Sequence, residues 1–294
     1  MLDPPPRFSV VIATRGRPAI LRETLESVAR CDPAPHETIV VDGDPARSAE
    51  PVARAAGTRY AHAAPGLTLQ RNVGLDLARG DVVVFVDDDT ELDPGLFAAL
   101  ARGYREPDVV GVTGPVHDRE LRRFGNMRSR WRRVLPGGGR EGSWTRFGYP
   151  RWVQDETRER DVEYMLGGLT TARREAAARV RFDERLRGYS YLEDEDFSYR
   201  LSRLGRIRFL PDAQVLHKNV GAGDKLGPGA RDFNRTVVVN RAYLFRKNFR
   251  RTPLARAQFA LLVGVLLVHR AVNGEWAGAR GLAEGAVEAW RRRP

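Results

Sequence analysis

Short apolar runs alternate with longer stretches of helical periodicity along the first 115 residues of the chain. Residues 8–13 are apolar and β-branched, and residues 18–30 then carry apolar side chains at helical spacing. The pair recurs, with strand-like runs at 38–41, 81–86 and 109–112 and helix-like stretches at 46–56, 67–78 and 94–104. Strands that alternate with helices predict βαβ units and a mainly parallel sheet. The expected fold class is therefore α/β, with a Rossmann-like first half.

The rhythm changes in the second part of the chain. Residues 118–160 are basic and contain three tryptophans and a Pro-Gly-Gly-Gly sequence, which predicts a long loop or insertion. Further on, the patterns predict strands at 162–166, 207–210 and 213–216 and a helix at 197–204. We therefore expect four segments: a Rossmann-like half at 1–117, the basic insertion at 118–160, a second half at 161–245 and a basic, partly apolar helical tail at 246–294.

The basic charge is concentrated in two of these segments. The formal net charge is +11. The insertion holds 12 arginines against 6 acids, and the tail holds 10 basic residues against 3 acids, so these two segments account for the positive charge. The rest of the chain is therefore close to neutral. Two basic regions on a neutral body predict contact with an anionic partner, such as phospholipid headgroups, a phosphorylated carrier or nucleic acid. Solvated arginine-rich faces are the alternative.

Cysteine content and the apolar runs bear on location. Cys31 is the only cysteine, which excludes an intramolecular disulfide and a cysteine-based zinc site, and the N-terminus shows no signal-peptide pattern. We expect a cytoplasmic protein. The apolar run 259–268 is shorter than the roughly 20 residues of a membrane-spanning helix. Because arginines flank it, it resembles an interfacial helix on the inner face of an anionic membrane, and packing on the rest of the chain or on an oligomer partner is the alternative.

The strongest chemical signal is a run of three aspartates, Asp87, Asp88 and Asp89, after the apolar segment 82–86. A strand that is apolar at every position is buried on both faces, and ligands of open α/β sheets bind at the carboxyl ends of such strands. In extended backbone Asp87 and Asp89 point to the same side. Two converging carboxylates favour a bound cation, and oxygen ligands suit Mg²⁺ or Mn²⁺. A helix-capping cluster is the alternative.

Other polar residues are expected at the same edge of the sheet. Thr14 and Arg15 follow the first strand and Asp42 ends the second, which suits a nucleotide diphosphate. His217 follows a later strand-like run. The acidic run 193–196 opens a helix, where the helix dipole accounts for part of it and one of the four acids is a candidate general base.

These motifs, in this order, resemble the family 2 nucleotide-sugar glycosyltransferases of GT-A fold. The resemblance covers residues 8–217 and leaves the basic insertion and the tail outside. Its segments are 10–18, 40–42, 70–74, 87–89, 167–168, 182–184, 193–196 with Arg200, and His217. It implies that 1–117 binds the nucleotide-sugar, that 161–245 forms the acceptor side with the catalytic acid cluster, and that the tail is a C-terminal helical extension. Rhamnosyltransferases that use a dTDP-activated sugar are the subset it suggests.

The resemblance also implies a role for each candidate residue. Asp194 would be the catalytic base, with Glu193, Glu195 and Asp196 as rivals. The metal, Mg²⁺ or Mn²⁺, would be held by the DxD pair, Asp87 and Asp89, and by His217. Asp42 would contact the base of the nucleotide, and Asp88 would approach the ribose. The residues implied to bind the nucleotide-sugar are Thr14, Arg15, Asp42, Arg71, Asp87 and Asp88.

We therefore expect an inverting, metal-dependent glycosyltransferase that moves a sugar from a nucleotide-diphospho-sugar to an acceptor hydroxyl in cell-envelope polysaccharide or glycolipid assembly. The expected acceptor is a glycan or a sugar on a polyprenyl diphosphate, and the insertion is expected to close over the bound donor. A sugar nucleotidyltransferase is one alternative, although the chain lacks a glycine-rich phosphate loop after the first strand. An arginine-rich nucleic-acid-binding protein is the other, with Trp131, Trp144 and Trp152 as stacking platforms.

Overall fold

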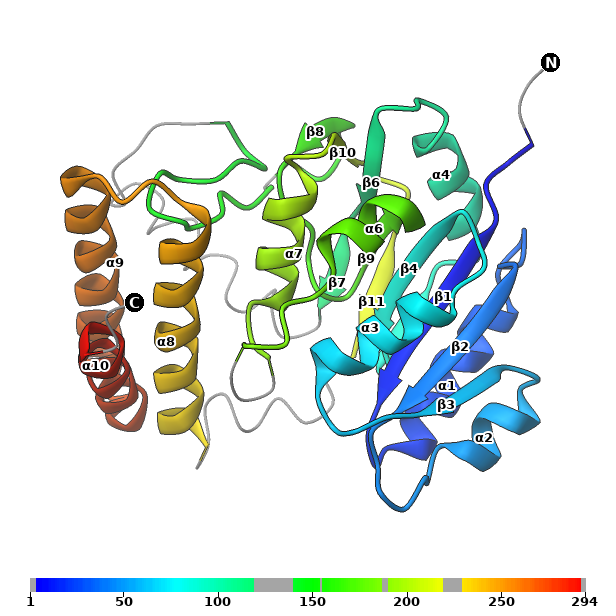
Figure 1. Cartoon of the computed structure of the whole chain (residues 1–294), viewed down its shortest axis with the longest axis horizontal. Coiled ribbons are helices and arrows are strands. Elements are labelled where there is room, and N and C mark those ends of the chain that lie inside the picture. The colour runs from blue at the N-terminus through cyan, green and yellow to red at the C-terminus, as the bar shows by residue number, and fades with distance from the viewer. Residues whose placement is uncertain (1–3, 119–139, 154, 187–189, 219–228, 292–294) are drawn as a thin grey trace.

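The computed structural model describes residues 4–118, 140–153, 155–186, 190–218 and 229–291. They form a central sheet flanked by helices, with a group of three helices beside it (Figure 1). The strands are β1 (Phe8–Thr14), β2 (Glu37–Asp42), β3 (Arg59–His62), β4 (Val82–Asp87), β5 (Thr90–Leu92), β6 (Val109–Thr113), β7 (Val116–Asp118), β8 (Arg160–Val162), β9 (Thr170–Arg173), β10 (Arg206–Phe209) and β11 (Val215–His217). The helices are α1 (Pro18–Ala29), α2 (Glu50–Ala55), α3 (Leu67–Leu77), α4 (Leu96–Gly103), α6 (Arg174–Val180), α7 (Glu193–Leu201), α8 (Ala230–Asn248), α9 (Pro253–Val272) and α10 (Trp276–Arg291).

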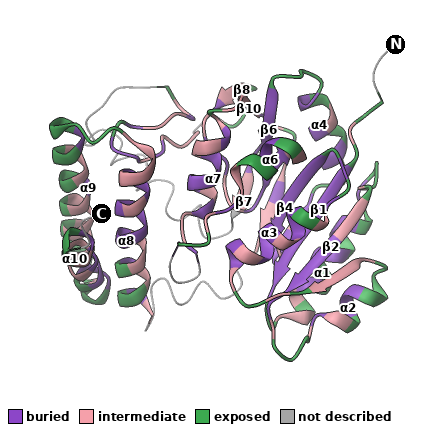
Figure 2. Cartoon of the chain, in the orientation of Figure 1, coloured by how far each residue is buried: buried purple, intermediate pink, exposed green. Residues whose placement is uncertain are grey.

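Five strands make the central sheet, in the order β3-β2-β1-β4-β9. The first four are parallel, and β9 runs antiparallel to β4. The central strands β1 and β4 are buried almost throughout (Figure 2), because an uninterrupted apolar strand can be covered on both faces. The expected α/β class with a mainly parallel sheet is confirmed.

The two faces of the sheet belong to two separate cores. Val10 and Ile12 of β1 pack with α1, α2 and α4, whereas Val11 packs with α3, α6 and α7 on the other face. This follows from the alternation of side chains along a strand. Gly74 allows the close approach of α3 to β1, since a Cβ atom at that position would lie 2.2 Å from Cγ1 of Val11.

Two three-stranded sheets extend this framework, in the orders β6-β10-β8 and β5-β11-β7. In the second, β11 pairs antiparallel with β5, and His217 is opposite Thr90. The strands β3, β5 and β7 were not predicted, because they are short and largely polar. The strand expected at 162–166 is instead β8, which ends at Val162. The acidic run 193–196 opens the helix α7, as expected, and the helix ends at Leu201, three residues before the expected end at 204.

The last three helices form a group of their own, in which α10 packs against both α8 and α9 and aromatic side chains of α9 and α8 meet (Figure 1). The helix α8 runs through the division that we expected between residues 245 and 246. The 20 residues of α9 make it the one helix in the described part of the chain that is long and apolar enough, by length and composition, to cross a membrane. The shorter apolar run 259–268 is the uninterrupted central part of this helix.

Candidate functional site

The side chains of Asp87, Asp89 and His217 converge at the carboxyl end of β4. The Nε2 atom of His217 lies 3.0 Å from Oδ1 of Asp89 and 3.8 Å from Oδ2 of Asp87. One candidate ligand atom from each residue lies within 4.8 Å of the others. The pairing of β11 with β5 brings the histidine there from far along the chain. Two carboxylates and an imidazole form a donor set that fits Mn²⁺ or Mg²⁺.

The middle aspartate points away from this cluster, as the alternation along an extended chain predicts. Asp88 is 1% exposed, and its carboxylate accepts a hydrogen bond of 2.7 Å from Oγ1 of Thr14 and forms an ion pair with Arg17. Burial raises the pKa of Asp88 to about 6, and the charge of Arg17 acts in the opposite direction. Asp88 and Thr14 thus bind each other, and their contacts with a nucleotide stay predictions.

A buried arginine joins the two acidic clusters of the chain. Arg71, on α3, is 1% exposed and pairs with Oδ1 of Asp87 at 2.8 Å and with Oε1 of Glu193 at 2.9 Å. Its guanidinium also lies over the ring of Phe182, 5.3 Å from the centroid. The residue expected near the nucleotide therefore connects the end of β4 to the start of α7.

The neighbours of Arg71 on α3 form hydrogen bonds with backbone groups of distant segments of the chain. Gln70 donates through Nε2 to the carbonyls of Thr14 and Val41, both at 2.8 Å, and so ties β1 to β2. Asn72 donates through Nδ2 to the carbonyl of Phe182 at 3.0 Å and accepts from its amide at 2.9 Å. Neither residue had a predicted role of its own, although both lie in segment 70–74, one of the motifs that resemble the family.

Asp42 and Arg15 lie at the same carboxyl edge in different surroundings. Asp42 is fully buried and accepts hydrogen bonds from the amides of Asp44 and Ala49 and from the hydroxyl of Tyr60, at 2.8, 3.1 and 3.2 Å. It therefore shapes the turn after β2. Arg15 is exposed, one residue beyond the end of β1. Contact of Asp42 with a nucleotide base stays a prediction.

The four acids of α7 differ in their partners. Glu195 forms a two-pronged ion pair with Arg241 of α8, at 2.8 and 2.9 Å. Asp196 pairs with Lys247 of α8 at 2.9 Å and with Arg200, while Glu193 pairs with Arg71. Asp194 is the one member that forms no ion pair with any described residue. The geometry thus separates the predicted base from its three rivals.

Asp194 lies beside a pair of glycines that reaches toward the cluster of Asp87, Asp89 and His217. A Cβ atom on Gly167 would lie 3.3 Å from Oδ2 of Asp194, and one on Gly168 would lie 3.8 Å from Cβ of His217. A side chain on Gly167 would crowd Asp194, and one on Gly168 would first meet Cγ1 of Val116, at 2.7 Å. The Oδ1 atom of Asp194 accepts a hydrogen bond of 2.9 Å from the amide of Glu195. Burial and the nearby charge of Glu195 raise the pKa of Asp194 to about 6.

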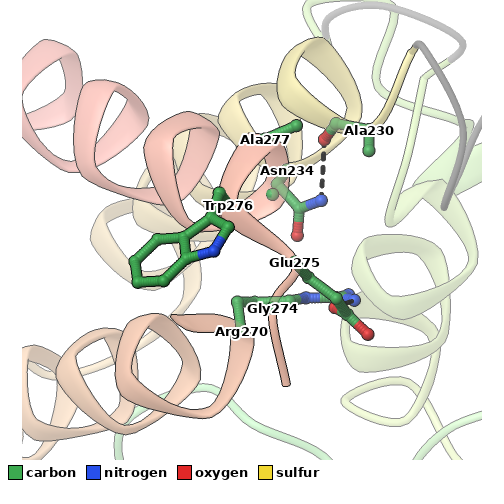
Figure 3. A pocket seen from close by; sticks show the side chains of 8 residues that line it. Ala230, Asn234, Arg270, Gly274, Glu275, Trp276 and Ala277 are labelled. Carbon is green, nitrogen blue, oxygen red and sulfur yellow. Dashed lines mark hydrogen bonds and ion pairs between the residues drawn. The ribbon is translucent and has the colours of Figure 1, made fainter. Parts of the chain in front are cut away.

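Two other features of the chain lie apart from this site. A pocket of about 300 Å³ opens between the start of α8 and the turn from α9 to α10 (Figure 3), where Arg270 pairs with Glu275 and no predicted site residue takes part. Trp144 and Trp152 both pack edge-on against Tyr164, with ring centroids 6.2 and 5.2 Å away. Trp131 and residues 119–139 of the expected lid lie outside the described residues.

Comparison with known proteins identifies the family. Residues 9–180 match the model of the family described as glycosyl transferase family 2, from β1 through α6. The chain belongs to this family. The family match confirms the predicted class of enzyme, a glycosyltransferase. It favours this class over the alternatives of a sugar nucleotidyltransferase and a nucleic-acid-binding protein. The matched residues include the aspartates that end β4, while α7 and His217 lie beyond the match.

A curated relative and several solved structures resemble this glycosyltransferase. An uncharacterized protein of Mycobacterium tuberculosis, MT1568, is 29% identical over 139 residues, so that the match spans 44% of this chain and 44% of that protein. A Pyrobaculum calidifontis mannosyltransferase in complex with GDP-Man and Mn²⁺ is 15% identical, with a TM-score of 0.60 over 99% of this chain and 89% of that one. S. aureus TarS is 18% identical, with a TM-score of 0.55 over 90% of this chain and 43% of that one. GalNAc-T7 with UDP, GalNAc and Mn²⁺ is also 18% identical, with a TM-score of 0.57 over 81% of this chain and 48% of that one. They confirm the GT-A fold.

Proposed function

We propose that the protein is an inverting, metal-dependent glycosyltransferase that moves a sugar from a nucleotide-diphospho-sugar to an acceptor hydroxyl. The observation that carries this proposal is the arrangement of two groups, the cluster of Asp87, Asp89 and His217 and the base candidate Asp194, around Gly167 and Gly168. Two of the similar structures hold a nucleotide or nucleotide-sugar together with Mn²⁺, which supports the same class of donor here.

The donor would lie at the carboxyl edge of the sheet. Asp87, Asp89 and His217 would hold Mn²⁺ or Mg²⁺, which supplies positive charge to the donor diphosphate. Arg15 is exposed at this edge and would pair with a phosphate oxygen. Arg71 is enclosed between two carboxylates, so we infer that it orients Asp87 and does not itself touch the nucleotide.

The chemistry at the acceptor follows from the environment of Asp194. Its Oδ2 atom, which faces the space at Gly167, would take the proton of the acceptor hydroxyl. The acceptor oxygen then forms a bond to the anomeric carbon while the bond from that carbon to the diphosphate oxygen breaks. A single displacement of this kind inverts the anomeric configuration. The raised pKa of Asp194 favours this role, because a stronger base removes the proton more readily.

We also propose a glycan acceptor, free or carried on a polyprenyl diphosphate, in cell-envelope assembly at the cytoplasmic face of the membrane. The basic tail supports this, because an anionic carrier or membrane would be attracted by its arginines. For the donor we propose dTDP-rhamnose, which the sequence resemblance suggests.

A nucleotide-binding screen tests the donor site. The purified protein is heated with UDP, GDP, CMP, dTDP or ADP, each with and without Mn²⁺. One nucleotide should stabilise it in the presence of metal, by about 2.7 kcal/mol at a concentration 100 times the dissociation constant. Asp89→Asn should lose this effect, and Asp93→Asn, at an exposed aspartate four residues further on, should keep it. Stabilisation by no nucleotide, or equal stabilisation of Asp89→Asn, would refute the proposed site.

The stereochemical outcome is tested separately. Once the donor is known, the anomeric proton of the product is followed by NMR from the first turnovers. Opposite anomeric configurations of donor and product support the single displacement. Retention of configuration would exclude Asp194 as a general base in one displacement.

A further inference from the structure

The outward faces of α9 and α10 carry an unusual amount of apolar surface. Every large apolar side chain that is about half exposed or more, among the described residues, lies on these two helices. They are Leu254, Leu261, Val268, Val272, Trp276, Val287 and Trp290, with exposed fractions from 49% to 81%. Figure 2 shows both helices exposed on the sides turned away from α8. Such a concentration of apolar surface indicates a binding partner.

The orientation of α9 is fixed by its other face. Ala255 and Leu262 are buried there against Phe245 of α8, and the ring of Phe259 stacks on Phe245 with centroids 4.9 Å apart. Leu254, Leu261, Val268 and Val272 recur at intervals of seven, seven and four residues, which places them on one side of a helix. Since the inner face is already packed, this outer stripe is left for a partner outside the chain.

The charges of the same helices are divided by sign. All three acids of α10 and the preceding turn are paired: Glu284 with Arg231, Glu288 with Arg235 and Glu275 with Arg270. In contrast, the exposed arginines at the start of α9 and the end of α10 form no ion pair with a described residue. They are Arg250, Arg251, Arg256 and Arg291. The apolar surface is therefore bordered by basic side chains, and its unpaired charge is positive.

This combination favours one partner over another. In a twofold dimer, a second copy would bring the same arginines toward each other without carboxylates to neutralise them. An anionic bilayer supplies both an apolar interior and negative headgroups. Tryptophan is suited to the boundary between the two, where Trp276 and Trp290 mark the two ends of α10.

We propose that the outward faces of α9 and α10 dock onto the surface of an anionic lipid bilayer, with both helices lying in the interface. The length of α9, about 30 Å at 1.5 Å per residue, would lie along the membrane. The helix does not cross the membrane, because its inner face is held against α8, whose ion pairs with α10 would have to enter the hydrocarbon.

Sedimentation with vesicles tests this proposal. Vesicles of phosphatidylcholine with added phosphatidylglycerol should bind the protein, and vesicles of phosphatidylcholine alone should bind it far less. The double variant Leu261→Asp/Val268→Asp should lose binding, because two charges would enter the apolar layer. Replacement of Arg250, Arg251 and Arg256 by glutamine should weaken binding about fivefold per residue, or roughly hundredfold in all.

Controls separate lipid docking from other causes. A control variant replaces three exposed arginines by glutamine: Arg22 of α1, Arg54 of α2 and Arg105, which follows α4. These residues lie outside α9 and α10, so this variant should bind vesicles like the wild type. Circular dichroism of the double aspartate variant should show an unchanged fold, because both positions are exposed. The metal-site variant Asp89→Asn should bind vesicles normally, so that failure of the proposed function and failure of this proposal are distinguishable.

Three results would overturn the proposal. The first is equal vesicle binding by the wild type and the double aspartate variant. The second is a dimer in sedimentation velocity without lipid that the double aspartate variant abolishes, since the apolar face would then belong to a second copy. The third is bound protein that resists both high salt and alkaline carbonate, which would indicate a spanning helix.

Discussion

Arg71→Met provides a direct test of how the two acidic clusters are held together. The substitution keeps most of the side-chain volume but removes the cation that pairs with Asp87 and Glu193 at 2.8 and 2.9 Å. Loss of one partner from a buried ion pair typically costs about 3–5 kcal/mol. Asp87 is about a quarter exposed and water can hydrate it, whereas the side chain of Glu193 is only 10% exposed. Most of the cost should therefore come from Glu193.

The pH dependence of this loss can be worked out from Glu193. Burial and the charge of Asp194 raise its pKa above the ordinary value of 4.5, and Arg71 opposes them, so the variant should raise it further. The wild type already carries part of this cost, because its Glu193 has a pKa raised to about 8. Relative to the wild type, the variant should therefore lose nothing through ionisation of Glu193 at pH 5.5, where the group is protonated in both proteins, and up to about 1.4 kcal/mol at pH 9. Because the pKa is higher in the folded state, stability is present at low pH and is lost as the pH rises.

Urea unfolding at the two pH values, in buffer with EDTA, measures both quantities. Arg71→Met should lose up to about 1.4 kcal/mol more at pH 9 than at pH 5.5, beyond any loss that is common to both pH values. The control is Arg181→Met, whose exposed ion pair with Asp76 also involves α3 and should cost at most about 1 kcal/mol. A loss in Arg71→Met that is equal at pH 5.5 and pH 9 would refute the reasoning.

Three further predictions concern α7 and its surroundings. If Asp194 is the base, kcat should fall about tenfold per pH unit below about pH 6, and Asp194→Asn should abolish transfer while nucleotide binding persists; a flat pH profile would contradict this role. Gly167→Val should lower kcat by crowding Oδ2 of Asp194 and leave the dissociation constant of the nucleotide unchanged in a titration; unaltered turnover would show that the space is not used. Arg241→Met should lower the free energy of unfolding by about 3–5 kcal/mol in urea, and a loss as small as that of the exposed control Arg280→Met would contradict burial of the pair with Glu195.

Much of the fold could be predicted because its strands are apolar at successive positions. The runs that became β1, β2, β4 and β6 are each bounded by turn-forming or charged residues, so pattern alone located them. The short strands β3 and β5 carry no such pattern, since pairing with β2 and β11 defines them. These two short strands depend on tertiary contacts that a local window of sequence does not contain, whereas the equally short β10 and β11 were predicted from their apolar runs.

The site shows the same division. Alternation along the chain correctly placed Asp87 and Asp89 on one side and Asp88 on the other. Sequence alone could not distinguish Asp194 from its neighbours, because the distinction depends on Arg71 from α3 and on Arg241 and Lys247 from α8. It also could not assign Gln70 and Asn72, whose partners are backbone groups of distant segments.

The ion pairs between α7 and α8 bear on how this enzyme can be divided. The family match ends at residue 180, which invites an expression boundary soon after it. A fragment cut there would lack His217, and a longer one that stops before α8 would leave Glu195 and Asp196 without Arg241 and Lys247. Exchange of the C-terminal helices between relatives would succeed only when the matching acids of α7 travel with them. Because α8 also pairs with α10 through Arg231–Glu284 and Arg235–Glu288, a fragment that keeps both sets of ion pairs runs from β1 to α10.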